Sequence, residues 1–179
     1  MSVFTNPASS SAEHGRAYTK AIIELLGDKN PISVLEQTVP MLRKALAGLT
    51  PQQEAQREAP NKWSVRHVVQ HLVDSELVWS WRLRLVLAQD RPTLTGYDQD
   101  LWADRLGYDE ADAARAMVEF SVVRLANLRL LHRASPQDLK RVGVHAERGE
   151  ESVEHMMKLY GGHDLLHLRQ IARIRQAIS

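Results

Sequence analysis

The sequence predicts an all-α protein, an antiparallel four-helix bundle with extra short helices and long loops. Apolar residues recur at helical spacing in four substantial segments, and strand-like residues are confined to 142–151. The chain has 179 residues, of which 44% are hydrophobic and 25% charged, the balance of a globular protein with a sizeable core. We expect a Ser-rich, irregular segment over 1–14 and a single helical-bundle domain over 15–179.

Local signals define the expected elements in chain order. Helices are predicted over 15–27, 31–47, 64–89, 109–133 and 152–177. Asn30 and Pro31 resemble an N-cap followed by a first-turn proline, and Pro40 predicts a kink or a late start of that helix. Ser64 and Ser152 are candidate N-caps of the long helices that follow them.

The segments between these helices carry turn signals. Residues 50–62 are polar, have prolines near both ends and are expected to form a long connection. Residues 92–107 are predicted to be a loop with one helical turn. Residues 142–151 are predicted to form a hairpin that turns at Gly149.

Composition excludes several classes of function. Lys and Arg total 23 against 22 Asp and Glu, which gives a net charge of +1. The sequence therefore has no excess of positive charge that would attract nucleic acid or an anionic membrane. Cysteine is absent, which excludes disulfides, cysteine nucleophiles and thiolate metal sites. No apolar run approaches the roughly 18 residues of a membrane span, and the start lacks the features of a secretory signal. We therefore expect a cytoplasmic protein.

The last predicted helix carries the most informative pattern. At about 100° per residue, one stripe of this helix holds Met156, Leu159, Tyr160, His163, His167, Ile171, Ile174 and Ile178. His163 and His167 lie one turn apart on this stripe, a spacing that lets two imidazoles reach one metal ion. The alternative is a pair of hydrogen-bonded core histidines. Gly161 and Gly162 before them indicate clearance for a neighbouring group or ligand, or a simple kink.

A third ligand is expected from the long helix over 64–89. His67 and His71 are themselves four residues apart, so spacing alone does not choose between them. Asp74, three residues after His71, is positioned to accept a hydrogen bond from a ligand imidazole and so tune the metal. Tyr160, one turn before His163, is a candidate for orienting a substrate, with core packing as its alternative role.

Three motifs in order give the chain a resemblance to a known family. The motifs are Trp63-Ser64 followed by His71-Leu72-Val73-Asp74, then Tyr97-Asp98 with Trp102, and Tyr160-Gly-Gly-His163-Asp-Leu-Leu-His167. Together they resemble the DinB superfamily in its YfiT-like branch, from about residue 31 onward. The branch often has a histidine at the place of His145, which is therefore a candidate for lining the site.

The resemblance implies a four-helix bundle that holds one divalent metal ion per chain, zinc or nickel, with three histidines. Carried over by position, these ligands are His71, His163 and His167, and His67 is left outside the site. Three imidazoles leave coordination positions open for catalysis.

The resemblance further implies an enzyme, most strongly one that transfers a low-molecular-weight thiol to an electrophile. A metal-dependent hydrolase on the same site is the alternative, because a bound metal can activate either a thiol or a water. A non-catalytic metal-binding or interaction bundle is a further alternative. We also expect a homodimer, because the long helix has more apolar surface than one core needs and Trp79, Trp81 and Trp102 could fill an interface.

Overall fold

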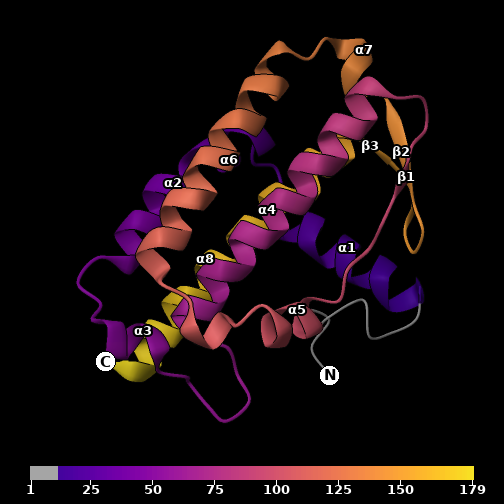
Figure 1. Ribbon diagram of the computed structural model, residues 1–179. Helices are drawn as coiled ribbons and strands as arrows, with labels where there is room; N and C mark the ends of the chain where they lie inside the picture. Colours follow the sequence, from indigo (N-terminus) through magenta and orange to yellow (C-terminus); the bar gives the residue numbers. More distant parts are fainter. Residues whose placement is uncertain (1–11) are drawn as a thin grey trace.

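The computed structural model describes residues 12–179 and consists mainly of helices, as predicted (Figure 1). The helices are α1 Ala12–Leu26, α2 Pro31–Leu46, α3 Pro51–Ala55, α4 Val65–Ala88, α5 Gln99–Arg105, α6 Ala113–Arg133, α7 Pro136–Leu139 and α8 Val153–Ile178, with a 3₁₀ turn η2 at Tyr108–Glu110. The strands are β1 Thr93–Leu94, β2 Val142–His145 and β3 Gly149–Ser152. None of the helices in this part of the chain is both long and apolar enough to cross a membrane.

Helices α2, α4, α6 and α8 form the four-helix bundle, and two apolar clusters fill its ends. The first joins the C-terminal halves of α2 and α8 to the N-terminal halves of α4 and α6, through residues such as Leu42, Val69, Phe120 and Ile171. The second joins the opposite halves, through residues such as Leu35, Trp79, Leu131 and Met156. Therefore α2 and α8 run in one direction, and α4 and α6 run antiparallel to them.

The connections between successive bundle helices explain these directions. The links from α2 to α4 and from α6 to α8 each reverse the chain at one end of the bundle. Each link joins two antiparallel helices that lie diagonally across the bundle, because α2 packs against α8 and α6, and α4 packs against α6 and α8. Between α4 and α6, however, the chain travels back along the bundle through β1, α5 and η2 (Figure 1). Helix α4 is about 36 Å long, and residues 89–112 are numerous enough to cover that return. The consecutive helices α4 and α6 consequently run parallel, a feature that helical periodicity does not reveal.

The helix ends agree with most of the local signals. The Asn30 side chain accepts a hydrogen bond from the backbone N–H of Ser33, and α2 continues through the exposed Pro40, so the late start is wrong. Ser152 caps α8 by accepting from the backbone N–H of His155. Helix α6 begins at Ala113 behind an Asp112 cap, later than the predicted start at residue 109, because the preceding residues form η2.

The predicted hairpin is present and belongs to a small three-stranded sheet. Strands β2 and β3 are antiparallel, with Gly149 at positive φ, and β1 adds in parallel to β2. The loop predicted over 92–107 therefore contributes a strand as well as the short helix α5. Likewise, the connection predicted over 50–62 contains the short helix α3, which Thr50 caps.

Helix α1 packs across α8 at the glycine pair. It begins at Ala12, three residues before the predicted start, and the rest of the irregular segment expected over 1–14 lies outside the described residues. A Cβ atom on Gly162 would lie 2.1 Å from the carbonyl oxygen of Ile22 in α1. The glycine pair thus provides clearance for the backbone of a neighbouring helix.

Candidate metal centre

Three imidazoles from two helices converge inside the bundle. His71 comes from α4, and His163 and His167 come from successive turns of α8. The Nε2 atom of His163 lies 3.2 Å from that of His71 and 3.1 Å from that of His167. Because the α8 stripe faces α4, the predicted histidine pair meets the predicted third histidine.

This geometry fits a divalent metal ion. Zinc–nitrogen bonds of about 2.0–2.1 Å in a tetrahedral site place two ligand nitrogens about 3.3 Å apart, close to the separations of the Nε2 atoms. The Nδ1–H group of His167 donates to Gln170 Oε1 at 2.8 Å, so its Nε2 lone pair faces the cluster. Three histidines do not complete a four-coordinate shell and leave at least one position open.

Burial keeps the three imidazoles neutral. It lowers the pKa of His167 to about 4 and lowers the pKa values of His71 and His163 well below the usual value for histidine. The neighbouring imidazoles act in the same direction on His71 and His163, because a first proton disfavours a second. Neutral imidazole is the form that binds metal, so the site is ready for a cation at neutral pH.

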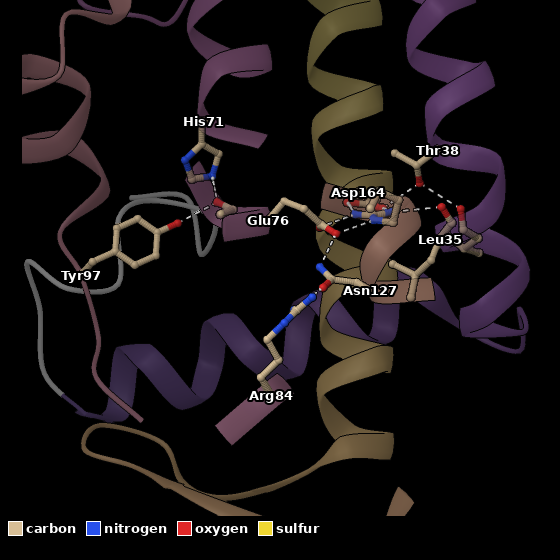
Figure 2. A network of polar contacts seen from close by, with 11 residues as sticks. Leu35, Thr38, His71, Glu76, Arg84, Tyr97, Asn127 and Asp164 are labelled. Atoms are coloured by element: carbon tan, nitrogen blue, oxygen red, sulfur yellow. Dashed lines mark hydrogen bonds and ion pairs between the residues drawn. The ribbon is translucent and has the colours of Figure 1, made fainter. Parts of the chain in front are cut away.

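Two hydroxyl groups extend the cluster toward α5. Ser75 Oγ lies 3.2 Å from His71 Nε2 and 2.7 Å from the hydroxyl of Tyr97. In Figure 2, dashed lines mark these contacts between His71 and Tyr97. Ser75 follows His71 by one helical turn, and this spacing is the signal that could have identified it. Tyr97 comes from the segment before α5, so sequence proximity does not connect it with His71.

Asp74 does not lie where the sequence suggested. Its carboxylate accepts a hydrogen bond of 2.5 Å from the hydroxyl of Tyr108, and it is not bonded to a ligand imidazole among the described residues. The helical rotation between His71 and Asp74 directs the carboxylate toward η2, where Tyr108 lies. Burial raises the pKa of Asp74. The predicted hydrogen bond is therefore replaced by one that fastens η2 to α4.

Tyr160 lies between the core and the site. Its ring is stacked on that of Trp79 with centroids 4.5 Å apart, and its centroid lies 6.1 Å from that of His163. Tyr160 also lines a cavity that His163 borders. The packing role is therefore observed, and the position is compatible with the predicted role in orienting a substrate.

His67 lies outside the cluster, as the family resemblance implied. Its Nδ1 atom lies 2.8 Å from Ser64 Oγ, and its Nε2 atom lies 3.3 Å from a carboxylate oxygen of Asp109. Arg57 joins the same group by donating to Asp109 at 2.6 Å. His67 thus ties the start of α4 to two of the connections.

A cavity of about 70 Å³ borders the three-histidine cluster at His163. Residues from five parts of the chain form its wall, including Tyr18, Ser75, Arg82, Tyr97, Tyr160 and His163. His145 stands behind this wall, where its Nε2 atom lies 3.3 Å from a terminal nitrogen of Arg82. A small molecule in the cavity would therefore lie beside the His163 imidazole.

A buried ion network supports α8 next to the site. Arg124 donates to both oxygens of Glu76 at 2.9 and 2.8 Å and to those of Asp164 at 2.6 and 3.2 Å. Asp164 directly follows His163 and also accepts from Thr38 at 2.7 Å (Figure 2). These contacts hold the turn of α8 that carries His163 against α2, α4 and α6.

Comparisons with known proteins agree with this site and fold. The chain is 29% identical over 167 residues to a Bacillus mycoides protein named "Putative metal-dependent hydrolase", with 90% of this chain and 92% of that protein covered. A relative of the same description from Oceanobacillus iheyensis is 27% identical over 144 residues, covering 80% and 83% of the two chains.

A solved structure is also similar. It is YfiT from Bacillus subtilis, described as "a probable metal-dependent hydrolase with an unusual four-helix bundle topology", with a TM-score of 0.77 and 26% identity, covering 82% of this chain and 84% of that one. The sequence pattern of the DinB superfamily matches residues 35–171, most of the chain. With its bundle topology and its three converging histidines, this chain belongs to the DinB superfamily.

Proposed function

We propose that the protein is a metal-dependent enzyme, with one zinc or nickel ion per chain held by His71, His163 and His167. The observation that carries this proposal is the convergence of three neutral imidazoles, of which His71 and His167 are buried and His163 borders a cavity. When bound, the ion would supply Lewis-acid activation of a coordinated thiol or water by lowering its pKa.

The reaction we propose is transfer of a small thiol to an electrophile. The thiol sulfur forms a bond to an electrophilic carbon, the leaving group departs with the bonding electron pair, and the proton of the thiol leaves with it. Asp74, the carboxylate predicted beside the site, is engaged by Tyr108. A bound metal would deprotonate a thiol outright but would lower the pKa of a water only to about 7, so a thiol depends less on a neighbouring base.

The residues of the cavity would position the reactants. Ser75 and Tyr97, already hydrogen-bonded to each other beside His71, would border the incoming nucleophile. Tyr160, held by its stacking on Trp79, would border the electrophile next to His163. These side chains would restrict a small ligand to the space beside His163.

Hydrolysis at the same site is the second candidate, because the relatives are named as metal-dependent hydrolases. In that case a water molecule attacks an ester or amide carbonyl carbon, and the alcohol or amine leaves with a proton. We place either enzyme in the cytoplasm, with small-molecule substrates and no nucleic acid or membrane partner, in keeping with the near-zero net charge.

The test combines metal analysis with two assays on metal-loaded protein. Thiol consumption is measured with an aromatic chloride or an epoxide, and ester and amide cleavage are measured in parallel. Thiol consumption that is lost in His163→Ala but kept in His67→Ala supports the proposal. Equal rates in wild-type protein and His163→Ala overturn it. Cleavage of esters or amides alone selects the hydrolase, and inactivity of fully loaded protein selects the interaction bundle.

A further inference from the structure

We propose that the cavity beside the three imidazoles recognises a single carboxylate group of the substrate, with Arg82 as its anchor. This inference rests on the proposed function in one respect, that the reacting end of the same substrate lies at the histidines. Arg82 and His163 both line the cavity, so a small ligand can contact both.

Arg82 is a buried cation that makes no salt bridge in the described part of the chain, although its charge helps to lower the pKa of Glu151, which is paired with Arg148. Arg82 is 4% exposed, its Nε atom has no hydrogen-bond partner there, and one terminal nitrogen donates to the carbonyl oxygen of Thr95. The other arginine of the cavity wall, Arg148, is already paired with Glu151 by two hydrogen bonds. Burying an unpaired charge is costly, so Arg82 is a binding group for an anion that comes from outside the fold.

His145 adds a second donor next to Arg82. Its Nδ1 atom accepts a hydrogen bond from the backbone N–H of Glu147 at 3.2 Å, so the proton of the neutral ring is on Nε2. Burial lowers the pKa of His145 to about 4, which keeps the ring neutral. Its Nε2–H group therefore lies 3.3 Å from a donor nitrogen of Arg82. Two facing donors do not satisfy each other, so His145 leaves this nitrogen of Arg82 available to an oxygen acceptor.

Two phenols in the same wall are also available as donors. Tyr18 and Tyr160 both line the cavity, and neither hydroxyl makes a hydrogen bond to another described residue, whereas that of Tyr97 is paired with Ser75. Burial raises the pKa values of Tyr18 and Tyr160, so both phenols stay protonated and can donate at neutral pH. An anion in the cavity would thus find an arginine and two phenol hydroxyls in one wall.

Glu147 limits the charge that the cavity accepts. Its carboxylate lies against Gly96, where a Cβ atom would come within 2.9 Å of Oε1, and both residues belong to the cavity wall. This carboxylate repels any anion in the cavity, and it repels a dianion such as a phosphate ester about twice as strongly as a single carboxylate. The small volume and the single unpaired cation together fit one carboxylate on a short substrate.

The experiment compares ligands that differ only in this group. Isothermal titration of metal-loaded protein measures the affinities of 3-mercaptopropionate, of its neutral amide, and of propionate, which lacks the thiol. We expect the mercaptocarboxylate to bind about 10-fold or more tightly than the amide, the usual gain from hydrogen bonds to a charged group. Arg82→Gln should remove this preference with the metal content unchanged. Arg169→Gln, which changes an exposed arginine of α8, should preserve it.

Two results would overturn the carboxylate site. One is equal affinity of the wild-type protein for 3-mercaptopropionate and its amide. The other is an unchanged preference for the acid in folded Arg82→Gln. If Arg82→Gln does not fold, the Tyr18→Phe/Tyr160→Phe double variant decides, because it removes only the two hydroxyls and should reduce the preference. Preferential binding of both acids without thiol transfer or hydrolysis keeps the carboxylate site and rejects the proposed function. Transfer of neutral thiols at rates that Arg82→Gln does not change keeps the proposed function and rejects the carboxylate site.

Discussion

At the scale of single residues, the site depends on which ring nitrogen each histidine presents. His167 donates through Nδ1 to Gln170 and so directs an unprotonated Nε2 at the cluster. His67 uses both nitrogens for contacts with Ser64, Arg57 and Asp109. Two histidines one turn apart on the same helix, His67 and His71, therefore have different roles because their neighbours differ.

Replacement of His71 by alanine should abolish stoichiometric metal binding. The variant retains only two imidazoles, which is too few to hold the ion against competing water. His67→Ala is the matched control on the same helix and should keep the metal, since His67 lies outside the cluster. Metal analysis of the purified proteins checks this prediction, and the opposite result would place the ligand one turn earlier in α4.

Metal binding should persist to lower pH than an ordinary histidine site would allow. An unperturbed imidazole titrates near pH 6.5, so the sequence alone predicts loss of metal below about pH 6. Burial lowers the pKa of His167 to about 4, and those of His71 and His163 are also lowered, so protons compete for the folded site only near that lower pH.

The same shifts determine the pH dependence of the metal-free fold. Between about pH 6.5 and the lowered pKa values, the unfolded chain binds more protons, so stability is complete above about pH 6.5 and falls as pH decreases. Metal content and circular dichroism after dialysis across this range test both statements. Half-release of metal near pH 6 from folded protein would contradict them, and retention well below pH 4 would indicate carboxylate ligands.

At the scale of elements, adjacent turns of α8 pack against α1 and carry two of the three histidines. Its glycines at 161 and 162 admit α1, and its histidines at 163 and 167 face α4. Each glycine makes helix formation about 1 kcal/mol less favourable than alanine would. The absence of a side chain at these positions lets α1 approach closely enough for Tyr18 to reach the cavity.

Gly162→Ala should destabilise the protein by about 1–3 kcal/mol, the usual cost of overpacking a close contact. The new Cβ atom would meet the backbone oxygen of Ile22 at 2.1 Å, and a backbone atom cannot move aside without α1. Gly161→Ala is the matched control, because the nearest neighbour of its Cβ atom would be a side-chain atom, Cδ1 of Leu26 at 3.2 Å, and not the backbone. Urea unfolding of both variants measures the difference. Equal stabilities would show that α1 shifts freely on α8.

At the scale of the whole molecule, one arginine connects the four helices of the bundle. Arg124 of α6 binds Glu76 of α4 and Asp164 of α8, and it donates to the backbone carbonyl of Leu35 in α2. Asn127 adds a further hydrogen bond to Glu76 at 2.8 Å. The network therefore joins all four bundle helices around one buried side chain.

Arg124→Met should lower the free energy of unfolding by about 3–5 kcal/mol, because it leaves two carboxylates buried without their cation. Arg173→Met removes an exposed arginine that pairs with Glu58 at 2.7 Å, and should cost less than about 1 kcal/mol. Chemical denaturation of both variants provides the comparison. A loss for Arg124→Met as small as that of Arg173→Met would show that the buried network is dispensable.

The homodimer remains a prediction, and of the three tryptophans proposed for its interface only Trp81 is exposed on the surface. Trp79 is buried in the core and Trp102 lies against Tyr97 with ring centroids 4.5 Å apart, whereas Trp81 is exposed, as is Leu77 one turn before it on α4. Light scattering should therefore give twice the chain mass of 20.3 kDa, and Trp81→Lys should reduce it to one chain. A wild-type mass of a single chain would reject the dimer.

Patterns local in sequence determined the helical class, most helix ends and the histidine pair on α8, because helical periodicity and capping depend on residues only a few positions apart. The family resemblance then selected His71 over His67, which spacing left open. Only the tertiary structure decided the parallel course of α4 and α6, the partner of Asp74 and the cavity around Arg82. These features join residues that are distant along the chain, such as Asp74 with Tyr108 and Arg82 with His145, and their contacts depend on how the helices pack.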